Sequence, residues 1–283
     1  MEGEECAFLP SPPPPCCLHS PPLLRTSPAR PGSDGGIATY PVLTWGMERF
    51  PAALRGSLLL GVVWAIGLLA AGMTLARQQT VDLILVLAMD ASASVDSQEF
   101  ALQTLGFAEA FRHPDVIAAI RSVGDEGIAV AVVQWAGLGQ QTVAVNWAVV
   151  IDQASGEAMA AQIETAGRKV VGATRIDQAL QFCTKLLANG PYRARRQVID
   201  VSGDGKSSNF GASTGRARDA ALAAGITVNG LAILNEEPDL GLYYGGEVVG
   251  GAGSFLMTAT DFRDFATAIR LKLILEIRGA PLA

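Results

Sequence analysis

After residue 80 the chain alternates between continuous apolar runs and amphipathic segments. The runs at 81–89, 127–135 and 226–234 lack the polar and apolar alternation of a half-exposed strand, so they predict strands that are covered on both faces. A further strand is expected at 197–201. The segment 142–149 follows a glycine-rich turn at the spacing of a hairpin, and we expect it to be a shorter antiparallel strand at an edge of the sheet.

Amphipathic segments with helical spacing separate these strands. Asp96 and Glu99 form a capping-box start for a helix that we expect to stop at His113-Pro114. The remaining expected elements are helices at 157–167, 176–190, 213–224 and after Asp261, and a short strand at 254–257. Strands that alternate with helices predict an α/β fold, namely a doubly wound, mostly parallel six-stranded sheet with helices on both faces and one antiparallel edge strand.

The first 46 residues differ in composition from the rest of the chain. They hold ten of its fifteen prolines, and such a segment cannot bury enough apolar surface to offset the entropy cost of ordering it. We expect residues 1–46 to be a disordered extension, or not to be translated at all. The second alternative arises because Met47 opens a segment with the features of a secretory signal peptide.

The segment 47–76 carries two arginines, continues with an apolar stretch and ends on Thr74 and Ala76, which suit a cleavage site. The alternative is an uncleaved membrane anchor, because residues 58–76 are nineteen positions without a charge, which is about the length that crosses a bilayer. Under both interpretations we expect the domain at 81–279 to be exported, either to the periplasm or out of the cell. Only the second places that domain at a membrane.

The net charge argues against a nucleic-acid partner, and the cysteine content argues against an internal disulfide. The chain has a net charge of −6 and no basic stripe, so nucleic acid is not expected as a partner. Cys183 is the one cysteine in the predicted domain, which therefore has no internal disulfide. Because it shares an apolar helical stripe with Leu180 and Leu187, we expect a packed core thiol.

Five oxygen-bearing side chains follow predicted strands or precede a predicted helix at one edge of the sheet. Asp90, Ser92 and Ser94 come after the first strand, Thr174 precedes a helix, and Asp204 follows the strand at 197–201. In a doubly wound sheet, ligands bind beyond the carboxyl ends of the strands. Two carboxylates and three hydroxyls, without imidazole or thiolate, suit a hard divalent cation, so we expect Mg²⁺ or Mn²⁺.

These residues resemble a known family. The Asp-x-Ser-x-Ser sequence at 90–94, Thr174 after a small residue, and Asp-Gly at 204–205 are similar to the metal-ion-dependent adhesion site of von Willebrand factor A domains. The order of elements agrees, and the resemblance covers residues 81–278. Within that superfamily, the segments 201–205 and 248–255 resemble a bacterial exported group called domain of unknown function 1194.

The resemblance implies a role for each residue. Ser92 and Ser94 would bind the metal directly, Thr174 would bind it directly or through water, and Asp90 and Asp204 would hold waters and compensate charge. A sixth coordination position would then accept a carboxylate from a protein or peptide partner. The expected function is a non-enzymatic binding module. The alternatives are a metal-dependent hydrolase that uses the same cluster, and a scaffold domain without metal.

Three features leave parts of this interpretation undecided, namely the residues before Asp204, the role of Asp200 and the segment 235–253. Ser202 and Gly203 precede Asp204 where many family members have Thr, and Asp200 is either a buried acid paired with a base such as Arg196 or an additional contributor to the site. His113 is the one histidine of the predicted domain; we expect it to satisfy carbonyls at a helix end, which argues against a catalytic triad.

The segment 235–253 is longer than most connections and carries Tyr243 and Tyr244. Either it contacts a partner, or it is an ordinary insertion packed by its own tyrosines.

Overall fold

A computed structural model of the protein describes residues 78–208 and 213–279. The predicted extension at 1–46 and the predicted signal peptide or anchor at 47–76 lie outside the described residues. In the part of the chain that is described, no helix is both long and apolar enough to cross a membrane.

A six-stranded sheet forms the centre of the domain, with the strand order β4-β3-β2-β6-β7-β8. Neighbouring strands are parallel except β3 and β4, which pair antiparallel at one edge. The strands are β2 (Leu83–Asp90), β3 (Ile128–Trp135), β4 (Gln141–Val150), β6 (Gln197–Gly203), β7 (Thr227–Ile233) and β8 (Leu256–Ala259). This sheet confirms the predicted fold class. A small parallel pair, β1 (Gln79–Thr80) with β5 (Tyr192–Arg193), was not predicted.

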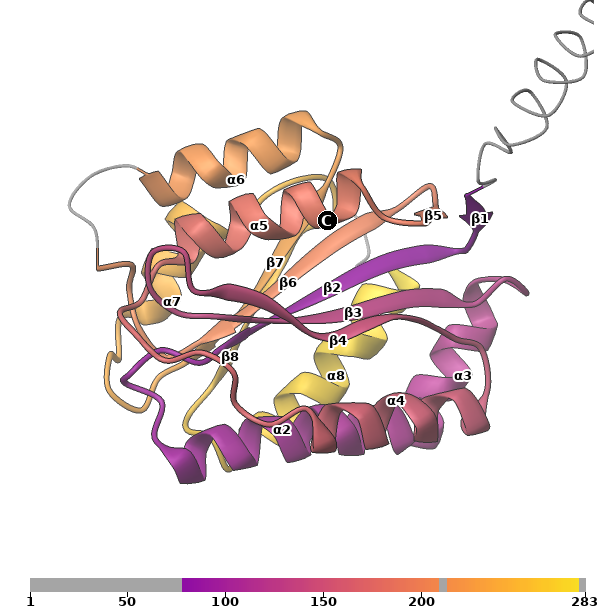
Figure 1. The fold of residues 1–283 in the computed structure, drawn as a ribbon, viewed down its shortest axis with the longest axis horizontal. Helices are drawn as coiled ribbons and strands as arrows, with labels where there is room; N and C mark the ends of the chain where they lie inside the picture. Colours follow the sequence, from indigo (N-terminus) through magenta and orange to yellow (C-terminus); the bar gives the residue numbers. More distant parts are fainter. Residues whose placement is uncertain (1–77, 209–212, 280–283) are drawn as a thin grey trace, which may run out of the picture. The chain divides into compact units, whose positions relative to one another are not determined.

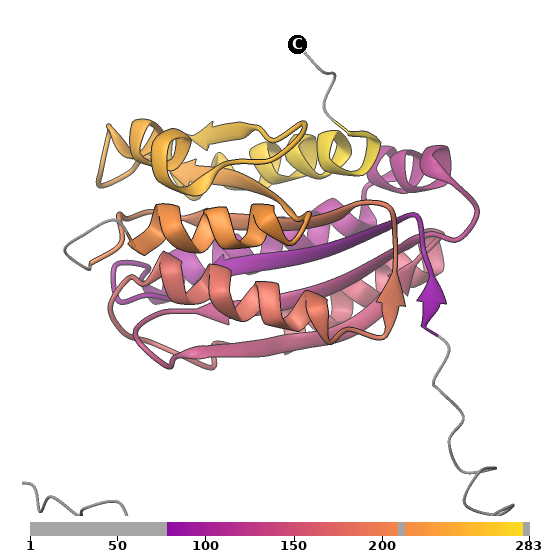
Figure 2. The same cartoon turned by 90° about the horizontal axis from the view of Figure 1, so that it is seen from above.

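Helices cover both faces of the sheet, as Figure 1 shows. On one face lie α2 (Ser97–Arg112), α3 (Pro114–Val123), α4 (Gln153–Thr165) and α8 (Phe265–Arg278), and on the other lie α5 (Ile176–Ala188), α6 (Ser213–Ala223) and α7 (Leu240–Tyr243). Figure 2 shows α5 and α6 side by side over their face.

The central strands explain this two-sided cover. Along β2, Leu85 and Leu87 pack into the cluster under α2 and α8, whereas Val86 and Ala88 pack into the cluster under α5 and α6. Since alternate side chains point to opposite faces, a strand buried on both faces must be apolar throughout. The described residues belong to one compact unit that contains both apolar clusters, which is the organisation of a domain that folds alone.

Helix α3 was missed in the sequence. Pro114 does stop α2, but it also opens α3 as its first residue, a position that suits its fixed φ and missing N–H. His113 caps the new helix, because its Nδ1 accepts the backbone N–H of Asp115 at 3.2 Å. The prediction that His113 satisfies terminal carbonyls of α2 holds for its backbone N–H, which donates to the Ala110 carbonyl at 3.2 Å, whereas its imidazole caps α3.

The segment 235–253 is not a plain loop either. It contains α7 and a π-helical turn, η2 (Tyr244–Val248), in which the Val249 N–H donates to the Tyr244 carbonyl at 2.9 Å. Tyr244 is fully buried in the core on the α5 and α6 face. For this tyrosine, the structure supports the interpretation as packing rather than as a surface that contacts a partner.

A buried charge cluster joins α8 to the centre of the sheet. The Lys272 ammonium donates to the carboxylates of Asp200 on β6 and Glu276 on α8, and all three side chains are buried. The Asn229 amide also donates to Glu276, at 3.3 Å. Asp200 is thus the structural acid that the sequence allowed, but its partner is Lys272 and not Arg196.

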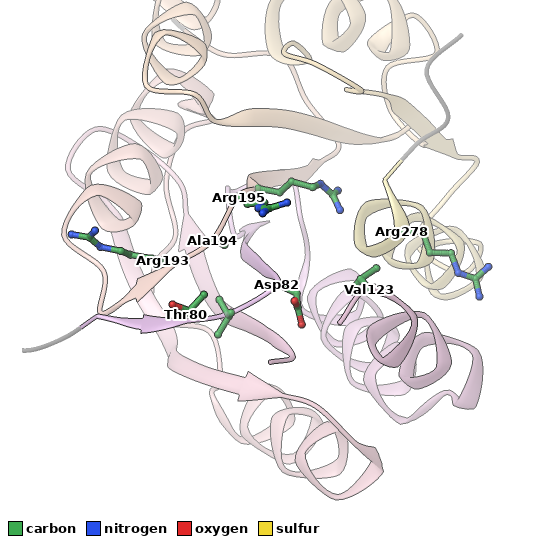
Figure 3. Close-up of a pocket in the computed structure, with 9 residues that line it drawn as sticks. Thr80, Asp82, Val123, Arg193, Ala194, Arg195 and Arg278 are labelled. Atoms are coloured by element: carbon green, nitrogen blue, oxygen red, sulfur yellow. The ribbon is translucent and has the colours of Figure 1, made fainter. Parts of the chain in front are cut away.

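At the amino edge of the sheet, a pocket of about 650 Å³ is lined by four arginines and Asp82 (Figure 3). Arg196 donates to the carbonyl oxygens of Glu276 and Ile277, in the last turn of α8. Figure 3 shows Arg193 and Arg278 pointing away from each other, so these two guanidinium groups do not converge on one anion. Arg193 donates to the Gln78 side chain, and Arg196 satisfies the end of α8.

Candidate metal centre

The loop after β2 places two serines against the end of β6. Asp90 is the last residue of β2, and its Oδ1 accepts the Ser92 backbone N–H at 2.7 Å, which turns the chain sharply. The Ser92 and Ser94 hydroxyl oxygens are 3.0 Å apart. The Ser94 hydroxyl donates to Asp204 Oδ1 at 2.8 Å. Ser94 and Asp204, which are 110 positions apart in the sequence, are therefore joined by a direct hydrogen bond.

Thr174 comes from a third segment. It lies just before α5, and its carbonyl accepts the Ser208 N–H at 2.8 Å, which ties this segment to the loop after β6. Its Oγ1 is 3.7 Å from the point that a Cβ on Gly205 would occupy, next to Asp204. The structure thus brings the five residues predicted from the sequence to the carboxyl edge of the sheet, on the left of Figure 1.

The two carboxylates are buried without a cation. Asp90 and Asp204 are 0% and 1% exposed, and neither forms an ion pair with any described residue. Burial, followed by the charge of Asp204, raises the pKa of Asp90 to about 8. Burial also raises the pKa of Asp204 to about 6, with the charges of Glu236 and Glu99 adding to the rise against the Ser94 hydrogen bond.

Each carboxylate has one oxygen without a partner. Asp90 Oδ2 and Asp204 Oδ2 are buried and accept no hydrogen bond from the described residues. Anionic oxygens in that state are costly unless a cation or a donor reaches them. The unpartnered oxygens and the neighbouring hydroxyls form an all-oxygen donor set, and this set fits Mg²⁺ or Mn²⁺.

No group of three or more His, Cys, Asp or Glu side chains suited to a metal occurs among the described residues. The candidate centre has only two carboxylates and depends on hydroxyl groups for the rest, so it lacks the Cys and His ligands that are typical of structural zinc and iron sites.

Two residues that support the centre, Gln103 and Arg168, were not predicted from the sequence. Gln103, buried on α2, donates to the Asp90 carbonyl at 3.0 Å and accepts from the Ser202 hydroxyl at 3.1 Å. Arg168 donates to the carbonyls of Ala91 and Ser92, at 2.9 and 2.6 Å. Gln103 had a signal, because it is a polar residue on the buried face of a predicted helix. Arg168 had none, since it acts across 76 positions of sequence on backbone atoms.

Gly203 explains the departure from the family pattern before Asp204. A Cβ there would lie 2.6 Å from Asp90 Oδ2, 2.8 Å from the Tyr244 hydroxyl oxygen and 3.2 Å from Trp135. These contacts are too close for a side chain, so this position requires glycine for the approach of its neighbours rather than for its backbone angles.

Comparisons with known proteins agree with this geometry at the level of the fold. Proximal thread matrix protein 1 from the mussel byssus matches at 14% identity over 71% of this chain and 47% of its own, with a TM-score of 0.50. The pilus adhesin SpaC from Lactobacillus rhamnosus GG matches at 13% identity over 71% of this chain and 31% of its own, also at 0.50.

A von Willebrand factor type A structure from Catenulispora acidiphila has 16% identity over 69% of this chain and 43% of its own, with a TM-score of 0.49. The mussel protein has also been solved with a zinc-occupied MIDAS motif, at 17% identity and a TM-score of 0.48 over 71% of this chain and 48% of its own. This chain therefore spans less than half the length of these proteins. No curated protein matches it.

The family model described as "Protein of unknown function (DUF1194)" matches residues 80–281, which is most of the chain and all but the first two of the described residues. The sheet order, the antiparallel edge pair and the helices on both faces are those of a von Willebrand factor A-like domain. The chain belongs to the DUF1194 family of proteins of unknown function, and its domain has the von Willebrand factor A-like fold.

Proposed function

We propose that the domain at 81–279 is an exported protein-binding module in which a divalent metal at the carboxyl edge of the sheet accepts an acidic group from a partner. One observation carries the proposal: Asp90 and Asp204 bury carboxylate oxygens that have no partner, beside three hydroxyl groups, and no described basic side chain forms an ion pair with either carboxylate. A cation from solution completes such a cluster, whereas an internal lysine would make it purely structural.

Ser92 and Ser94 would contact the metal directly, and Thr174 directly or through water. Asp90 and Asp204 would hold metal-bound waters and balance the charge. Mg²⁺ prefers six oxygen ligands, and it keeps waters that other groups can replace. A carboxylate on a partner protein or peptide is the natural group for the remaining position, because it brings both an oxygen ligand and a negative charge.

A hydrolase at the same place would need a general base. His113 lies beyond the far end of α2, whose sixteen residues extend for about 24 Å from the Asp90 loop. Asp204 would then have to act as the base while it also holds the metal. Binding needs neither role and is therefore the simpler function for this donor set.

The adhesin role of the Lactobacillus protein is a property of that protein. For this chain, adhesion or another protein contact is part of the proposal, as is export through the segment 47–76. Carboxylate recognition at a surface that faces away from the cell fits both parts.

The first test measures metal binding alone. Isothermal titration of residues 78–283 with MgCl₂ and MnCl₂ should show one ion per domain, and Ser92→Ala or Ser94→Ala should weaken binding at least tenfold. Ser122→Ala is the matched control, because the Ser122 hydroxyl bonds only the Ala119 carbonyl within α3. A wild-type domain that binds neither ion would be a metal-free scaffold, and the proposal would be wrong.

The second test separates binding from catalysis. Metal-dependent turnover of a phosphoester or ester substrate that disappears in Ser92→Ala would establish the hydrolase instead. If there is no turnover, capture from an exported fraction should retain proteins on the wild-type domain that are lost with chelator and on Ser94→Ala.

A further inference from the structure

Tyr244 is the large buried polar side chain nearest to the candidate metal centre that the proposed function does not use. It is fully buried, and its hydroxyl has no hydrogen-bond partner among the described residues. It begins the π-helical turn η2, a rare element that is found frequently at functional sites. A buried hydroxyl without a partner is costly, so its placement requires an explanation.

The Tyr244 hydroxyl lies across Gly203 from the carboxylate of Asp90. Both oxygens lie within 3 Å of the point where a Gly203 Cβ would be, at 2.8 Å for Tyr244 and 2.6 Å for Asp90 Oδ2. The third neighbour of that point is a ring carbon of Trp135, whose own N–H already donates to the Ala88 carbonyl at 3.0 Å. The Tyr244 hydroxyl and Asp90 Oδ2, neither of which has a hydrogen-bond partner among the described residues, are therefore neighbours at Gly203.

We propose that Tyr244 is a positioning residue of the metal centre, whose hydroxyl orients Asp90 by donating to Oδ2, directly or through one water, when the metal is bound. This inference rests on the proposed function. The other oxygen of Asp90, Oδ1, is held by the Ser92 N–H. A donor on Oδ2 fixes the second oxygen, so that both oxygens of the carboxylate are held in place while the metal is bound. Groups that orient metal ligands in this way contribute strongly to metal affinity.

Tyr243, the neighbouring residue, provides the contrast. Its hydroxyl donates to the Thr214 hydroxyl at 3.1 Å and accepts the Ser207 N–H at 3.4 Å, so it holds the loop after β6 and α6 together. The two rings pack edge to face at 6.3 Å. Tyr243 therefore joins two loop segments by hydrogen bonds, whereas the Tyr244 hydroxyl lies near the Asp90 carboxylate. The segment 235–253 is tied to the centre through both.

The test compares Tyr244→Phe with Tyr243→Phe in residues 78–283. Isothermal titration should show that Tyr244→Phe weakens Mg²⁺ and Mn²⁺ binding about 10- to 100-fold. With chelator present, the same variant should be as stable as the wild type or more so, because phenylalanine fills the same space without the unpartnered hydroxyl. Tyr243→Phe should leave metal affinity within about threefold.

Each other outcome overturns the inference in a different way. Unchanged metal affinity in Tyr244→Phe would show that the hydroxyl does not serve Asp90. A parallel loss of stability in chelator would show a packing role only. In an Asp90→Asn background, a further loss on adding Tyr244→Phe would show that the tyrosine acts elsewhere. If the wild type binds no metal, the proposed function fails first, and that result is distinguishable from all three.

Discussion

The domain buries two pairs of acids, and they differ in where a cation comes from. Asp200 and Glu276 share the ammonium of Lys272 between β6 and α8, although one oxygen of each carboxylate also has no hydrogen-bond partner among the described residues. Asp90 and Asp204, at the end of the same sheet, are as deeply buried but share only hydroxyl groups. Asp200 and Asp204 are four residues apart, so the contrast occurs within one strand and its following turn.

The physical reason for the contrast is the cost of burying charge. An ionised carboxylate in the interior must find a counter-charge and donors, or it takes up a proton. The chain supplies the counter-charge for the first pair itself, and that pair holds α8 to the sheet. For the second pair it supplies none among the described residues, and a cation from outside can fill that role. A cluster with its own lysine therefore indicates architecture, and one without indicates a site.

The largest expected effect comes from removing the internal cation. Lys272→Met should lower the free energy of unfolding by roughly 3–5 kcal/mol, because Asp200 and Glu276 would remain buried without a counter-charge. Urea denaturation of residues 78–283 measures this. Lys185→Met, at an exposed position of α5, should change the value by less than about 0.5 kcal/mol. A Lys272 variant as stable as the control would remove the basis of the comparison.

Because Asp90 and Asp204 have no internal cation, we expect the stability of the domain to depend on pH. The folded-state pKa of Asp90 is raised to about 8 from 3.8, so the native state holds this proton more tightly than the unfolded state. Its contribution to stability is therefore fully present below about pH 4 and is lost as the pH rises through about 8. In chelator, Asp90→Asn should remove this loss and be more stable than the wild type at pH 8, by on the order of 2 kcal/mol.

Magnesium should reverse that order at pH 8. Metal binding stabilises only the native wild-type protein and favours the ionised carboxylates, so the wild type should gain stability while Asp90→Asn gains little. Thermal unfolding from pH 5 to 8, with chelator and with Mg²⁺, measures all four curves. If the two chelated proteins show the same slope, Asp90 does not carry a raised pKa.

The sequence predicted the candidate centre better than it predicted the internal pair. Asp90, Ser92 and Ser94 lie within five residues, and their position at the end of an apolar run indicates the carboxyl edge of a sheet. The four central strands, β2, β3, β6 and β7, were predictable for a similar reason, because burial on both faces leaves a continuous apolar run. The pairing of Asp200 with Lys272 depends on the packing of α8 against β6 across 72 residues, and no local pattern specifies it.

Helix α3 and η2 were missed for local reasons. Pro114 ends one helix and begins another, and both roles suit the same residue. The π-helical turn at Tyr244 forms where glycines follow a tyrosine pair, and that composition is equally typical of a loop. The packing of Tyr244 beside Gly203 is a tertiary contact across 41 positions, so the sequence left both interpretations of this segment open.

The smallest expected effect concerns an acid that lies close to the centre but belongs to neither pair. Asp96 caps α2, because its Oδ1 accepts the N–H groups of Gln98 and Glu99 at 2.7 and 2.8 Å. Asp96→Ala should therefore cost about 1 kcal/mol of stability, whereas Asp96→Asn, which keeps a capping oxygen, should cost little. Urea denaturation measures the stability of both variants. Mg²⁺ titration measures their metal affinity, which should stay within about threefold of wild type in both. A tenfold loss of Mg²⁺ affinity in Asp96→Asn would mean that an exposed carboxylate takes part in the centre. The candidate centre would then not be limited to the buried acids that lack an internal cation.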